Sequence, residues 1–170
     1  MSFTTTDTRG VPALPEGGSR RLYSDEERVR RDATKWTLVQ GVLAPVQFLV
    51  FLASLALVLR YLWTGAGYEV ATISIVIKTF FLILIMVTGA IWEKVVFGQY
   101  LFAHAFFWED VFSFVVIALH TWYMAALFAG SMSADGMMYI ALAAYLAYVI
   151  NAGQFIWKLR MARLDAESRT

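Results

Sequence analysis

Four long apolar stretches dominate the chain, at residues 36–59, 70–92, 111–134 and 136–157, and they contain one charged side chain between them, Lys78. Each exceeds the roughly 20 residues that a helix needs to cross a hydrocarbon layer. Backbone groups find no water in lipid, so spans of this length must be helical. The pattern predicts an all-α membrane protein, a four-transmembrane-helix bundle with helices at about 37–62, 70–92, 109–130 and 136–158.

The segments that flank these spans are polar. Residues 1–23 contain prolines and glycines without an apolar core, which predicts a flexible N-terminal tail. Ser24 and Glu27 fit a capping box at the start of a short amphipathic helix that continues to Lys35. We therefore expect a single membrane domain over 24–164, with 165–170 as a C-terminal tail.

The connection between the second and third spans is unusually aromatic. Six of the twelve residues from Phe97 to Trp108 are Phe, Tyr or Trp. An aqueous loop would be polar and rich in turn residues, whereas aromatic rings prefer the level of the lipid headgroups. This pattern predicts an aromatic interfacial segment between helices 2 and 3.

Composition and charge narrow the class of protein. Hydrophobic residues make up 59 % of the 170 residues, more than a soluble chain of this size could bury. The chain has no cysteine, which excludes disulfides, thiolate nucleophiles and Cys-bound metals. Eleven of the fourteen Lys and Arg residues lie in the first 35 or the last thirteen positions. Basic flanks of this kind place both termini in the cytoplasm and do not indicate a nucleic-acid binder.

Polar side chains in or beside the spans are candidate functional groups, because they are costly in lipid. On the third span, Glu109, Ser113 and His120 share one helical face, with Asp110 on its flank. Glu109 and His120 are about 16 Å apart along the axis, so both could contact one large flat ligand. Candidates on the other spans are Glu93, Lys78, Asn151 and Gln154.

Each carboxylate and the span histidine also has a structural interpretation. Glu93 could be a solvated helix end. Glu109 and Asp110 would interact favourably with the positive end of a helix dipole. His120 could be a neutral buried side chain that hydrogen-bonds to a neighbour.

The remaining polar candidates have similar alternatives. Lys78 is expected to extend its ammonium toward the headgroups on the side opposite the termini. Asn151 and Gln154 could simply be hydrogen-bond partners between helices. Motifs of soluble enzymes, such as a phosphate loop, HExxH or GxSxG, do not occur in the sequence.

Several long strings resemble one known family. They are VTGAIWEKVVFGQYLFA at 87–103, AFFWEDVFS at 105–113, ALHT at 118–121, YSDEER at 23–28, WTLVQGVLAP at 36–45, and INA at 150–152 followed by QF at 154–155. In order and spacing, residues 21–164 resemble the 3-vinyl bacteriochlorophyllide hydratase family of bacteriochlorophyll biosynthesis. Such long strings are far more specific than a short motif.

The resemblance implies a hydro-lyase. It would add water to the C3 vinyl group of chlorophyllide a or 3-vinyl bacteriochlorophyllide a to give the 3-(1-hydroxyethyl) product. The implied location is the bacterial inner (intracytoplasmic) membrane. Implied partners are the tetrapyrrole substrate, lipid and neighbouring enzymes of bacteriochlorophyll synthesis, with no nucleic acid. No cofactor is expected beyond the magnesium that the substrate carries.

The implied reaction requires an acid, an oriented water molecule and a shaped pocket. We expect Glu109 to be the general acid, Asp110 or Glu93 to orient water, and His120 to lie near the magnesium or the macrocycle edge, with His104 as the alternative near the magnesium. The expected substrate-binding residues are Phe97, Tyr100, His104, Phe106, Phe107, Trp108, Ser113, Asn151 and Gln154.

Two other functions remain open from the sequence. A non-catalytic membrane pigment carrier or assembly subunit would share the aromatic pocket but would not need a protonatable carboxylate beside the vinyl carbon. A small membrane anchor for a soluble partner would need neither the pocket nor the acid cluster. The aromatic run could likewise be only an interfacial anchor.

Overall fold

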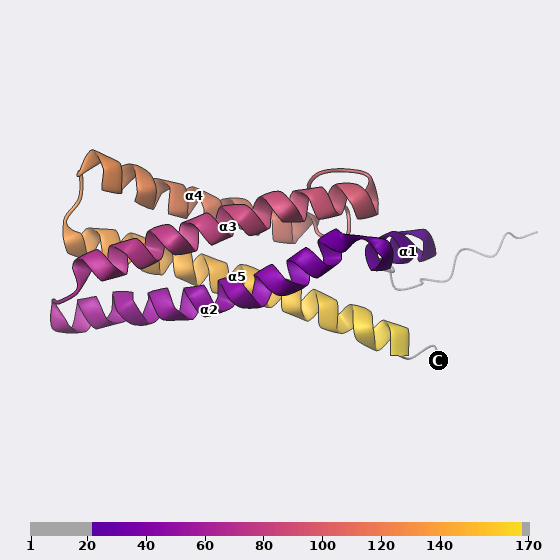
Figure 1. The fold of residues 1–170 in the computed structure, drawn as a ribbon, viewed down its shortest axis with the longest axis horizontal. Helices are drawn as coiled ribbons and strands as arrows, with labels where there is room; N and C mark the ends of the chain where they lie inside the picture. Colours follow the sequence, from indigo (N-terminus) through magenta and orange to yellow (C-terminus); the bar gives the residue numbers. More distant parts are fainter. Residues whose placement is uncertain (1–21, 168–170) are drawn as a thin grey trace, which may run out of the picture.

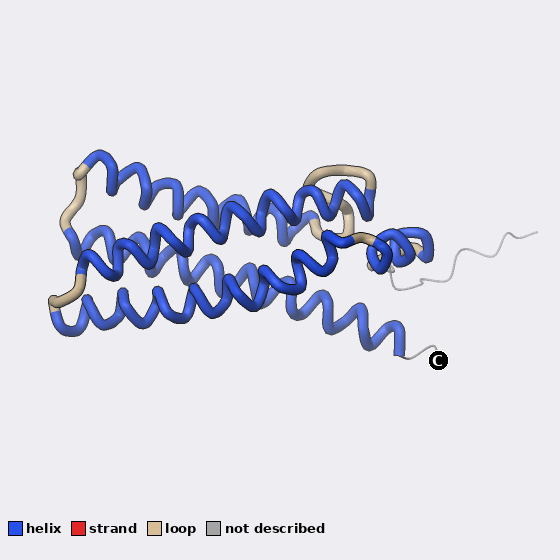
Figure 2. The backbone as a smooth tube through the Cα atoms, viewed as in Figure 1, coloured by secondary structure: helices blue, strands red, loops and turns tan. Residues whose placement is uncertain are grey.

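The computed structural model describes residues 22–167, which form five helices and no strand (Figures 1 and 2). The elements are α1 (Asp25–Ala33), α2 (Lys35–Thr64), α3 (Tyr68–Phe97), α4 (Phe107–Ala129) and α5 (Ala134–Glu167). The four long helices run along one axis, and α1 lies at one end of the bundle (Figure 1). The end of α5 and the α3–α4 connection lie at this same end, which we call the α1 end.

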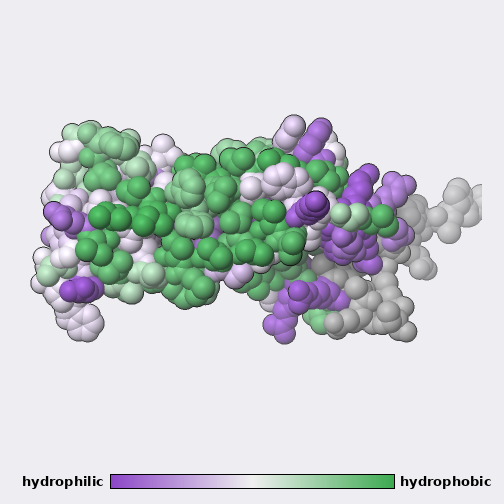
Figure 3. Space-filling view, viewed as in Figure 1, coloured by the Kyte–Doolittle hydropathy of each residue, from purple (hydrophilic) through white to green (hydrophobic). Residues whose placement is uncertain are grey.

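Helices α2 to α5 are each long and apolar enough to cross a membrane. On the face drawn in Figure 3, hydrophobic side chains cover the middle of the bundle, and the largest group of hydrophilic residues lies at the α1 end. The predicted all-α, four-span architecture is confirmed, and the protein is a multi-pass membrane protein.

The helices extend beyond the expected spans at the α1 end. Helix α3 continues to Phe97 and α4 begins at Phe107, so the connection comprises only residues 98–106. Helix α5 continues to Glu167. Of the expected tails, residues 1–21 and 168–170 lie outside the described residues, whereas Tyr23 is packed into the domain with 4 % of its surface exposed.

Helix α1 is fastened to the end of α3. The predicted capping box is confirmed, because the Ser24 amide donates to Glu27 at 2.7 Å and the Glu27 amide donates to the Ser24 hydroxyl at 3.2 Å. The Arg30 Nε donates to the Val96 carbonyl at 2.8 Å. The Tyr23 ring stacks on Phe97 with centroids 5.7 Å apart, and burial raises the pKa of Tyr23 to about 12.

The middle of the bundle contains a buried lysine. Lys78 is fully buried, and its Nζ lies 4.1 Å from the centroid of the Tyr148 ring and 5.6 Å from that of Tyr145. The expectation that Lys78 extends toward the headgroups is therefore wrong. The faces of two tyrosine rings attract the ammonium inside the bundle, as aromatic faces attract cations generally.

Candidate active site

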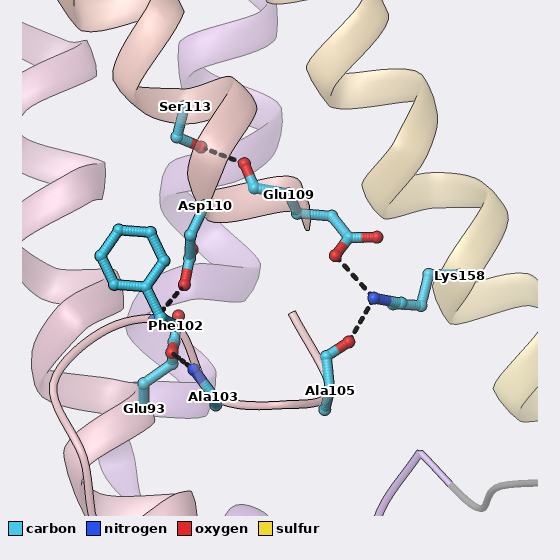
Figure 4. Close-up of polar contacts among 8 residues, drawn as sticks. All are labelled: Glu93, Phe102, Ala103, Ala105, Glu109, Asp110, Ser113 and Lys158. Atoms are coloured by element: carbon cyan, nitrogen blue, oxygen red, sulfur yellow. Dashed lines mark hydrogen bonds and ion pairs between the residues drawn. The ribbon is translucent and has the colours of Figure 1, made fainter. Parts of the chain in front are cut away.

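The first turn of α4 presents two buried carboxyl groups. Glu109 and Asp110 are 6 % and 3 % exposed. As neighbours on a helix they diverge by about 100°, and Figure 4 shows their side chains pointing to opposite sides of the turn. Both also lie where the helix dipole stabilises negative charge. The turn thus supplies carboxylates to two different surroundings.

Glu109 points toward α5. Its Oε2 accepts a hydrogen bond from Lys158 Nζ at 2.5 Å, and Lys158 also donates to the Ala105 carbonyl (Figure 4). One turn further along α4, the Ser113 hydroxyl donates to the Glu109 carbonyl at 2.9 Å and accepts from the Asn151 amide at 2.8 Å. These contacts tie α4 to one stripe of α5.

A cavity of about 490 Å³ opens beside this ion pair. This volume is in the range of roughly 300–1,000 Å³ that is typical of small-molecule sites. Among Glu93, Glu109 and Asp110, only Glu109 reaches its wall. The lining residues are Glu109, Gly153, Gln154, Trp157, Lys158 and Met161.

Asp110 and Glu93 instead hold the α3–α4 connection. Asp110 Oδ2 accepts from the Phe102 amide at 2.6 Å, and Glu93 Oε2 accepts from the Ala103 amide at 3.2 Å (Figure 4). The two carboxyl groups also interact with one another. Phe102 has a φ of 59°, a left-handed conformation that is strained for a bulky residue. The Glu93–Asp110 carboxyl pair therefore holds a tight turn in which Phe102 adopts a backbone conformation that bulky residues disfavour.

The predicted aromatic residues fall into two groups. Phe97 and Phe106 pack with Tyr23 and Trp92 in an internal cluster that joins α1 to the bundle. The other predicted aromatic side chains are exposed, and they are Tyr100, His104, Phe107 and Trp108. None of the six is among the residues that line the cavity.

His120 lies apart from the acid cluster. It is 1 % exposed, its Nδ1 is 2.8 Å from the Val116 carbonyl, and its ring lies against Tyr145 with centroids 6.1 Å apart. Lys78 is its charged neighbour. The structure thus brings Glu109, Ser113, Asn151 and Gln154 together, but it does not bring His120 to them.

Lys158 was not among the predicted site residues, although the sequence places it on the polar stripe of the fourth span. Its position in the C-terminal group of basic residues favoured a simple membrane-flanking role. The available signal was its place on the same helical stripe as Asn151 and Gln154, at spacings of seven and four residues. Trp157 and Met161, also missed, line the cavity, and their exposed side chains place them at its outer rim.

Comparison with known proteins assigns the chain to a family. The family model described as 2-vinyl bacteriochlorophyllide hydratase (BCHF) matches residues 23–161, a range that includes every residue of the site. The chain belongs to this family. No solved structure is significantly similar to this BCHF-family protein.

Two BCHF relatives are similar over nearly their whole length. The 2-vinyl bacteriochlorophyllide hydratase of Cereibacter sphaeroides is 72 % identical over 158 residues, which cover 92 % of this chain and 98 % of the relative. The protein of the same name from Rhodobacter capsulatus is 70 % identical over 160 residues, which cover 93 % and 92 % respectively.

Proposed function

We propose that this protein hydrates the C3 vinyl group of chlorophyllide a or 3-vinyl bacteriochlorophyllide a, as a hydro-lyase of bacteriochlorophyll biosynthesis. The observation that carries the proposal is the Glu109–Lys158 pair in the wall of a cavity that suits an apolar ligand, in a chain of the BCHF family. The pair provides the proton transfer that hydration of an alkene requires, which a pigment carrier does not need.

The chemistry follows from the pair as a unit. Lys158 and Glu109 hold one transferable proton between them. When the macrocycle covers the cavity and excludes water, burying two full charges costs more than burying a neutral pair. The shared proton then moves to Glu109, which donates it to the terminal vinyl carbon. The conjugated macrocycle delocalises the resulting cation, water adds to the inner carbon, and the proton that this water releases returns to the pair.

The other predicted residues take different parts in this proposal. Asp110 and Glu93 shape the α3–α4 connection rather than orient water, because both accept backbone hydrogen bonds there. His104 is exposed on the α3–α4 connection with its ring against Phe97, so of the two histidines it is the one we propose lies near the substrate magnesium. His120 is enclosed in the bundle and supports its core.

The proposed location is the bacterial inner (intracytoplasmic) membrane with both termini in the cytoplasm. The N-terminal and C-terminal basic residues flank α1 and the end of α5, and these elements lie at the same end of the bundle (Figure 1). The site then lies in the cytoplasmic half of the membrane, where the hydroxyethyl product could pass to neighbouring enzymes of the pathway.

The test is incubation of the purified protein in detergent with a 3-vinyl chlorophyllide, followed by mass analysis of the pigment. We expect a gain of one water. Pigment that co-purifies with the protein unchanged, with no gain of mass over many turnover times, would favour the carrier function instead.

A further inference from the structure

Two amide oxygens next to the Glu109–Lys158 pair accept no hydrogen bond from the described residues. They are Asn151 Oδ1 and Gln154 Oε1, and both atoms are buried. Leaving a buried acceptor unpaired is unfavourable, so two of them together call for a ligand that donates hydrogen bonds. An apolar macrocycle edge cannot satisfy them.

The surroundings fix the place of these two acceptors. Asn151 and Gln154 are three residues apart on α5 and therefore lie on one face. The Asn151 amide nitrogen is anchored by the Ser113 hydroxyl at 2.8 Å, which directs its oxygen away from that bond. Gln154 lies between Asn151 and Lys158 along the stripe and lines the cavity together with Glu109.

We propose that Asn151 Oδ1 and Gln154 Oε1 bind the water molecule that the reaction consumes. This inference rests on the proposed hydration. Water is a small double donor, which suits two acceptors three residues apart on one helical face. Buried water molecules typically have two to four polar partners of this kind. With both O–H groups donated to the amides, a lone pair on the water oxygen faces the cavity.

The step balances within the described groups. After Glu109 has protonated the terminal vinyl carbon, the water oxygen forms the new C–O bond with its lone pair at the inner carbon. The protonated alcohol then turns one O–H group from its amide acceptor to the Glu109–Lys158 pair and gives up that proton, which restores the starting state. No oxidant, reductant or further co-reactant is required.

Because the inner carbon becomes a stereocentre, a water molecule held on one side should attack one face of the vinyl group. The experiment compares the wild type with Gln154→Met, which keeps a similar side-chain length and removes the acceptor. Gln40→Met is the matched control, since Gln40 is also a membrane glutamine but bonds to Thr88 away from the cavity. Gln154→Ala serves as the second variant should the methionine variant fail to fold.

We expect Gln154→Met to lower kcat on the order of 10²-fold with little change in the KM for pigment, and to shift the ratio of the two product epimers toward one to one. The control should change neither quantity. Wild-type hydration with unchanged kcat and epimer ratio in both Gln154 variants would overturn the water site and leave the proposed function standing. A wild type that does not hydrate the vinyl group would overturn the proposed function itself.

Discussion

The Lys158–Glu109 pair gives the most direct test of how the site is held together. Lys158→Met keeps most of the side-chain length and removes the ammonium that neutralises Glu109. Removing one partner of a buried ion pair costs about 3–5 kcal/mol, because the other charge stays buried. The Lys158 side chain is 26 % exposed against 8 % for Glu109. Water can partly replace the ammonium. We therefore expect Lys158→Met to lower the free energy of unfolding by about 2–3 kcal/mol, at or below the lower limit of that range.

The double variant Glu109→Gln/Lys158→Met separates this cause from lost packing. It leaves no unpaired charge, so it should recover most of the stability that Lys158→Met loses. Chemical unfolding in a fixed detergent, followed by circular dichroism, measures the four free energies of the cycle. Lys94→Met is the control, because Lys94 is exposed and donates to the Gly98 carbonyl at the same end of the bundle. Additive losses in the double variant would refute the ion-pair argument.

Four further outcomes are expected. Glu109→Gln should lower the hydration rate by about 10²–10⁴-fold and keep pigment binding, because the amide preserves size and loses the proton; steady-state kinetics and pigment titration check this. Asp110→Ala should speed hydrogen exchange at the Phe102 amide, which loses its acceptor at 2.6 Å, and unchanged exchange would contradict the role of Asp110 in the turn. Tyr23 should stay protonated at pH 11, since burial raises its pKa to about 12. Its contribution to stability should be complete below pH 10 and lost as the pH rises through 12. The tyrosinate absorbance of the wild type against Tyr23→Phe measures this ionisation. A tag at the C-terminus should be labelled only from the cytoplasmic side, and labelling from the other side would reject the proposed topology.

The membrane architecture follows from sequence because lipid leaves the backbone few choices. A run of more than 20 apolar residues without charge must satisfy its own backbone groups, which requires a helix. The positions of the helix ends are less determined by the sequence of the spans. Helical hydrogen bonding continues beyond the lipid boundary until a capping residue ends it. Helix α3, for example, ends at Phe97, and Gly98 after it adopts the left-handed conformation that closes the helix.

The site was only partly accessible to sequence analysis. The polar face of α4 identified Glu109 and Ser113, because helical periodicity fixes which residues of one helix lie together. The partnership with Lys158 depends on how α4 and α5 pack, and periodicity within one helix does not set that register. The same limit explains Lys78, since nothing within α3 indicates that its ammonium meets two tyrosine rings of α5.

The outer rim of the cavity has a kinetic consequence. Trp157 and Met161, which form it, are 67 % and 43 % exposed on the outer surface of α5 near the end of its apolar span. A ligand that enters across this rim arrives by diffusion in the plane of the bilayer rather than from bulk solution. The concentration that governs its arrival is the mole fraction of pigment in the lipid or detergent phase. At a fixed amount of pigment, adding more detergent or lipid should therefore slow turnover by dilution within the surface phase, while adding more buffer should leave it unchanged.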